Sequence, residues 1–170
     1  MQGYQRARHY RDKSNELETI GKQVISDDRP ELKALNILYA WRSPPRYDQQ
    51  RNRVVQGECK RLSNRERDLF GFDCCIIIAK KIWKELSAKQ KYRLMYHELK
   101  HLSVELDDTG KPEVDDHNRV KIRILKHDMN LERFEDEIRK FGPDSQERVF
   151  LKKVSRLYHD FKKAHDTTSS

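Results

Sequence analysis

The sequence lacks the features that mark membrane proteins and secreted disulfide-rich domains. Its 170 residues include three cysteines, an odd count that argues against a disulfide framework and favours a reducing compartment. No apolar run approaches the roughly 18–20 residues of a membrane-spanning helix. The first 13 residues are polar and basic, without the apolar stretch of a secretory signal. We therefore expect a cytoplasmic protein without a membrane partner.

Hydrophobic residues are also scarce, at 35% of the chain against 38% charged residues, although the length fits one compact domain. The formal net charge is +8, from 36 Lys and Arg against 28 Asp and Glu. No block of five or more like charges occurs, and the signs alternate in stretches such as 64–68. A solvated mixed-charge surface explains this pattern, and a basic surface that binds nucleic acid is the alternative.

Hydrophobic spacing predicts a mixture of helices and strands. Leu17, Ile20 and Val24 share one helical face, and residues 72–79 are apolar on both faces, as in a central strand. Ser87 and Gln90 form a capping box that predicts a helix from residue 88 to about 105. The other expected elements are a helix from 27–30 through Trp41, a strand over 53–62, a turn over 107–112, an edge strand over 119–125, and helices over 128–141 and 144–164.

The motif H-E-x-x-H spans residues 97–101, inside the helix with the capping box. Residues four apart lie on one helical face, so His97 and His101 can reach the same metal ion. Neutral imidazole is a common ligand of Zn²⁺, which acidifies a bound water molecule. Glu98 can take a proton from that water as it attacks a carbonyl group. The motif therefore predicts a hydrolytic zinc site with Glu98 as general base.

A catalytic zinc site usually has three protein ligands and an open fourth position, and the motif supplies two. His127 follows the expected edge strand and precedes Asp128, which could cap a helix or hydrogen-bond the ligand. His117 lies in the loop before that strand. The spacing leaves both histidines open as the third ligand. Cys74 and Cys75 are adjacent on a strand and point to opposite faces, which favours core packing over a second metal site.

The order of these segments resembles the putative phage metallopeptidase family, a zincin group related to the SprT-like proteases. The resemblance covers roughly residues 28–142 and rests on residues 38–42, 71–78, 83–87, 94–101 and 127–134. It implies an α+β fold, a small zincin-like domain in which a short mixed β-sheet packs on the H-E-x-x-H helix with flanking helices. It also implies a Zn²⁺ cofactor and makes His127, the later histidine followed by aspartate, the third metal ligand.

On this basis we expect a helical N-terminal extension over 1–27, the zincin-like metallopeptidase domain over 28–142, and a C-terminal helix with a polar tail over 143–170. The expected activity is zinc-dependent hydrolysis of peptide bonds in a protein or peptide substrate. The resemblance implies a phage-encoded enzyme, in the host cytoplasm or associated with the virion. The alternatives are a non-catalytic zincin-fold phage protein that binds a protein or nucleic-acid partner, and a SprT-like protease associated with DNA.

Overall fold

The computed structural model describes residues 13–50, 52–125 and 139–141, and the chain divides into two compact units, Met1–Leu125 and Lys126–Ser170. In the second unit, residues 139–141 are helical. The first unit is a mixed α+β structure. Its elements are α2 (Asn15–Asp28), the 3₁₀ helix η1 (Pro30–Ala34), β1 (Ile37–Arg42), β2 (Arg46–Asp48), β3 (Arg53–Val55), β4 (Gly57–Arg61), α3 (Asn64–Phe70), β5 (Cys74–Ala79), α4 (Lys80–Glu85), α5 (Ala88–Lys100), β6 (Leu102–Val104) and β7 (Ile122–Ile124).

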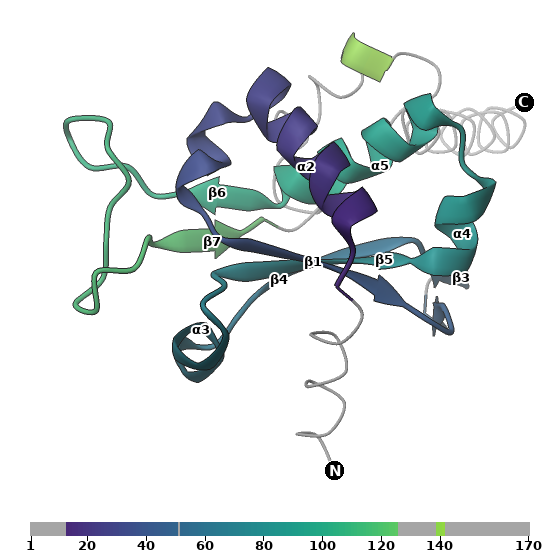
Figure 1. Cartoon of the computed structure of the whole chain (residues 1–170), viewed down its shortest axis with the longest axis horizontal. Coiled ribbons are helices and arrows are strands. Elements are labelled where there is room, and N and C mark those ends of the chain that lie inside the picture. Colours follow the sequence, from purple (N-terminus) through teal and green to yellow (C-terminus); the bar gives the residue numbers. More distant parts are fainter. Residues whose placement is uncertain (1–12, 51, 126–138, 142–170) are drawn as a thin grey trace, which may run out of the picture. The chain divides into compact units, whose positions relative to one another are not determined.

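The core of the first unit is a three-stranded sheet in the order β1-β5-β4, with β1 parallel and β4 antiparallel to β5. All six residues of β5 are buried, which confirms the prediction of a central strand. Helices α2 and α5 lie together on one side of this sheet (Figure 1). Cys75 packs with Leu38 and Ala40 in one hydrophobic cluster, while the adjacent Cys74 is buried as well. The prediction that both cysteines are core residues is confirmed.

Helix α2 begins at the Ser14 cap, whose hydroxyl accepts a hydrogen bond from the Leu17 amide at 3.2 Å. Leu17 and Val24 are fully buried, as their helical spacing predicts. Gly21 faces Tyr39 on β1 so closely that a Cβ atom there would lie 2.4 Å from the tyrosine ring. The absence of a side chain at Gly21 lets the helix pack against the strand.

The helix predicted from residues 27–30 through Trp41 is wrong. Helix α2 extends to Asp28, and Pro30–Ala34 forms only a 3₁₀ turn before β1 begins at Ile37. Strand β1 pairs with β5 along its whole length, and its central residues are buried. The apolar residues of 37–41 therefore fill a strand in the sheet, and long-range pairing overrides a spacing that also fits a helix.

The helix predicted over 88–105 ends five residues early, at Lys100. Leu102–Val104 instead forms β6, which pairs antiparallel with β7. The edge strand expected over 119–125 is confirmed in a shorter form, with Ile122 buried and Arg123 exposed. The turn expected over 107–112 is also present, with Gly110 at a φ of 80°.

The strand expected over 53–62 is divided into β3, which pairs with β2, and β4, which pairs with β5. Helices α3 and α4 were not predicted. A capping box between Ser63 and Glu66 and a left-handed Gly71 at the helix end are signals that identify α3.

The helices predicted over 128–141 and 144–164 lie outside the described residues, apart from 139–141. No helix of the described residues is long and apolar enough to cross a membrane.

Candidate functional site

The H-E-x-x-H motif lies at the C-terminal end of α5, with His101 as the C-cap residue, and local signals fix where this helix begins. The Ser87 hydroxyl accepts from the Gln90 amide at 3.4 Å, and the Gln90 side chain accepts from the Ser87 amide at 2.9 Å. This confirms the capping box. The exposed fractions of His97, Glu98 and His101 are 6%, 4% and 8%. The motif is therefore not a pair of histidines on a solvated helix face.

The two histidine rings face one another in an edge-to-face arrangement. Their centroids are 5.1 Å apart and their planes form an angle of 86°. The Nδ1 atom of His101 lies 2.6 Å from the Leu125 carbonyl oxygen, and the Leu125 amide donates to the His101 carbonyl at 2.8 Å. Because a carbonyl oxygen can only accept, Nδ1 carries the proton and Nε2 carries the lone pair of the neutral ring. This tautomer and its backbone partner are typical of a metal-binding histidine.

Glu98 lies against β4, one of the two edge strands of the three-stranded sheet. A Cβ atom placed on Gly57 would be 2.3 Å from Oε1 of Glu98 and 2.6 Å from its Cδ. Cys59 is on the same strand. Burial raises the pKa of its thiol, and the Cys74 thiol and the Glu98 carboxylate raise it further. The Glu98 side chain is thus enclosed between its own helix and the backbone of β4.

Arg29 holds the end of α5 from a position 70 residues away in the sequence. Its Nη1 donates to the Leu99 carbonyl at 3.1 Å, and its Nη2 donates to the Leu102 carbonyl at 2.8 Å. Its Nε pairs with Glu31 at 2.5 Å. A cation near the last carbonyl groups of a helix satisfies their hydrogen bonds and opposes the helix dipole. Arg29 therefore holds the backbone before and after His101 through the carbonyl groups of Leu99 and Leu102, a role that its local sequence does not indicate.

The third predicted ligand, His127, lies outside the described residues, so its role stays a prediction. The alternative, His117, is described and is exposed, and its amide donates to the Asp115 carboxylate at 2.9 Å. Across residues 13–50, 52–125 and 139–141, no three His, Cys, Asp or Glu side chains form a group that could hold a metal ion. The structure thus brings together His97 and His101, and His117 does not join them.

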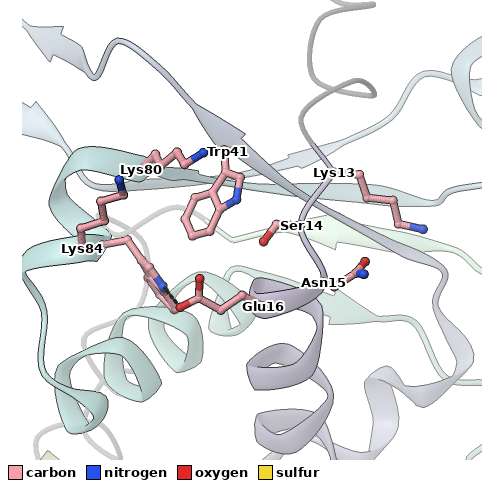
Figure 2. A pocket seen from close by; sticks show the side chains of 8 residues that line it. Lys13, Ser14, Asn15, Glu16, Trp41, Lys80 and Lys84 are labelled. Atoms are coloured by element: carbon pink, nitrogen blue, oxygen red, sulfur yellow. Dashed lines mark hydrogen bonds between the residues drawn. The ribbon is translucent and has the colours of Figure 1, made fainter.

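A cavity of about 390 Å³ opens where α2 begins (Figure 2). Beside it the Trp83 indole donates to the Glu16 carboxylate at 2.8 Å, and this hydrogen bond lowers the pKa of Glu16. The cavity contains none of the predicted site residues. Its lining consists of Lys13, Ser14, Asn15, Glu16, Trp41, Lys80, Trp83 and Lys84.

Comparison with known families gives a match. The family described as putative phage metallopeptidase matches residues 8–162. This range is longer than the 28–142 over which the motifs show their resemblance, and it includes all of α2. Comparisons with curated proteins and with solved structures found no match.

Proposed function

Because the chain belongs to the putative phage metallopeptidase family, we propose that it is a zinc peptidase in which His97 and His101 bind the metal. The observation that carries the proposal is the buried histidine pair at the C-terminal end of α5, with the His101 tautomer fixed by the Leu125 carbonyl. The family implies a metal ion and a peptide substrate. Two imidazole ligands fit Zn²⁺, and an H-E-x-x-H helix beside a short mixed sheet fits a zincin-like domain.

The residues of the site have separate roles in the proposed reaction. When bound, the metal polarises a peptide carbonyl group and makes a nearby water molecule more acidic. His97 and His101 hold the ion, and the hydrogen bond to Leu125 orients the His101 ring. Glu98 takes the proton from the attacking water and passes it to the nitrogen of the leaving amine. A buried carboxylate enclosed by β4 has few alternative orientations, which favours this proton transfer.

We include His127 as the third ligand because a catalytic zinc site usually has three protein ligands and the motif supplies two. The resemblance to the family makes the later histidine, the one followed by aspartate, the third ligand. In this chain that residue is His127, which is followed by Asp128.

Zinc content tests the ligand set. We expect about one zinc ion per chain in the wild-type protein and in His117→Ala, and loss of zinc in His97→Ala and His127→Ala. Circular dichroism of each variant shows whether it remains folded. A wild-type protein that binds no zinc after incubation with it would overturn the proposal. Loss of zinc in His117→Ala alone would assign the third ligand to that residue.

Hydrolysis of an unfolded protein substrate tests the activity. Glu98→Gln keeps the shape of the side chain and removes the base, so we expect unchanged zinc content and a rate lower by about 10²–10⁴-fold. A protein that binds zinc without hydrolysing peptides would be a non-catalytic binding protein instead. Binding of DNA that weakens steeply with salt would favour the DNA-associated alternative.

A further inference from the structure

Gly57 is the first residue of β4 and lies against the side chain of Glu98. A Cβ atom at this position would be 2.3 Å from Oε1, 2.6 Å from Cδ and 2.8 Å from Cγ of Glu98. Carbon atoms in contact are normally about 3.5–4.0 Å apart. Three successive atoms of one side chain thus occupy the space that any residue other than glycine would need.

Backbone conformation does not explain a glycine here. The glycines with positive φ among the described residues are Gly71 and Gly110, so the backbone at Gly57 is one that other residues can adopt. Glycine within a strand lowers stability, because it loses more conformational freedom on folding and offers no side chain to pack. The close approach of Glu98 accounts for this residue at this position.

We propose that Gly57 is a positioning residue for Glu98, holding the carboxylate in its orientation by leaving room for it against the β4 backbone. The proposal rests on the proposed function, in which Glu98 is the general base. Every residue of α5 from Leu94 to Lys100 is buried, so the helix cannot retreat from the strand. A methyl group on residue 57 would instead move the carboxylate by about 1 Å or more.

The kinetic test is Gly57→Ala, measured as the zinc-loaded full chain on an unfolded protein substrate. A displacement of about 1 Å at a reacting group can lower a rate by about 10²-fold. We expect kcat to fall by roughly this factor, while KM changes by less than about threefold and zinc content stays that of the wild type. A kcat within about twofold of wild type, or loss of zinc from the variant, would overturn the proposal.

Gly21→Ala is the matched control. Gly21 also has no room for a Cβ atom, which would lie 2.4 Å from the Tyr39 ring, and it is on α2. Both variants introduce one crowded methyl group, and we expect each to lower Tm by about 3–10 °C. Only Gly57→Ala should lower kcat. An equal loss of kcat in both variants would show that crowding acts through general loss of structure and would overturn the proposal.

A double-mutant cycle of melting temperatures tests the contact between Gly57 and Glu98 without an activity assay. Gly57→Ala should lower Tm in the wild-type background and have less than about half this effect when combined with Glu98→Ala, which removes all three crowded atoms. Should Gly57→Ala alone fail to fold, a folded double variant supports the proposal. If Gly57→Ala lowers Tm equally in both backgrounds, or if the double variant also fails to fold, the proposal is contradicted.

The proposed function and the proposal for Gly57 are contradicted by different results. A zinc-loaded wild-type protein without peptidase activity would overturn the proposed function and, with it, a catalytic purpose for Gly57. The double-mutant cycle would then decide by itself whether Gly57 makes room for Glu98.

Discussion

Replacement of Arg29 by alanine should destabilise the protein much more than loss of an ordinary surface arginine. The Arg29 side chain is 15% exposed and donates to the carbonyl groups of Leu99 and Leu102 at 3.1 and 2.8 Å. These carbonyl groups lie on either side of His101. Removing the guanidinium leaves both without this donor and removes a cation from the C-terminal end of α5.

The magnitude follows from these contacts. A hydrogen bond to a charged group contributes about 1.5–3 kcal/mol, and a cation at a helix end contributes about 0.3–1 kcal/mol. Water reaches part of the Arg29 site and replaces some of what is lost. We therefore expect Arg29→Ala to lower the free energy of unfolding by about 2–4 kcal/mol, which corresponds to roughly 5–15 °C in Tm. Arg29→Lys should recover about half of the lost free energy of unfolding, because an ammonium group cannot reach both carbonyl groups as the planar guanidinium group does.

Denaturant unfolding followed by circular dichroism measures this difference. Arg123→Ala is the matched control. Arg123 pairs with Glu105 at 2.6 Å, yet its side chain is 71% exposed, so its loss should cost less than about 0.5 kcal/mol. An Arg29→Ala variant as stable as Arg123→Ala would refute the reasoning. This result would show that water hydrogen-bonds the carbonyl groups of Leu99 and Leu102 as well as the guanidinium group does.

Three further outcomes test other parts of the structure. Ser87→Ala should lower the free energy of unfolding by about 1 kcal/mol in denaturant titrations, because it removes the N-cap of α5. Burial raises the pKa of Cys75 to about 12, so this thiol should resist a thiol reagent at about pH 8 until the protein is unfolded. The hydrogen bond from Trp83 lowers the pKa of Glu16 on folding, so its stabilisation is present above the unfolded pKa and is lost as pH falls through the folded pKa. Glu16→Gln should therefore reduce the loss of Tm at acidic pH, and an unchanged acid profile would contradict this.

Elements defined by neighbouring residues could be predicted from the sequence. The Ser87 and Gln90 capping box fixes where α5 begins, and both partners are within one helical turn. The apolar run of β5 identifies a strand buried on both faces. In each case the residues that determine the element also form it. The spacing of His97 and His101 on one helical face belongs to the same class.

Elements defined by distant pairing could not be predicted in this way. Residues 37–42 have a spacing that also fits a helix, and only their pairing with β5 makes them a strand. Residues 102–104 extend the polar and apolar pattern of α5, but they pair with β7, about twenty positions further along the chain. A short apolar segment takes the structure of the partner that buries it, and that partner is not visible in its own sequence.

The contacts that orient the candidate site have no sequence signature at all. Leu125 acts on His101 only through its backbone, and Gly57 acts on Glu98 by lacking a side chain. Arg29 is one of 36 basic residues, and only its burial against α5 distinguishes it. A motif search therefore finds the groups that could carry the chemistry, since their identity is chemical. The directions in which the imidazole and the carboxylate point depend on tertiary contacts. Substitution can change the contacts made by Arg29 and Gly57, whereas Leu125 makes its contact through the backbone and keeps it when its side chain is changed.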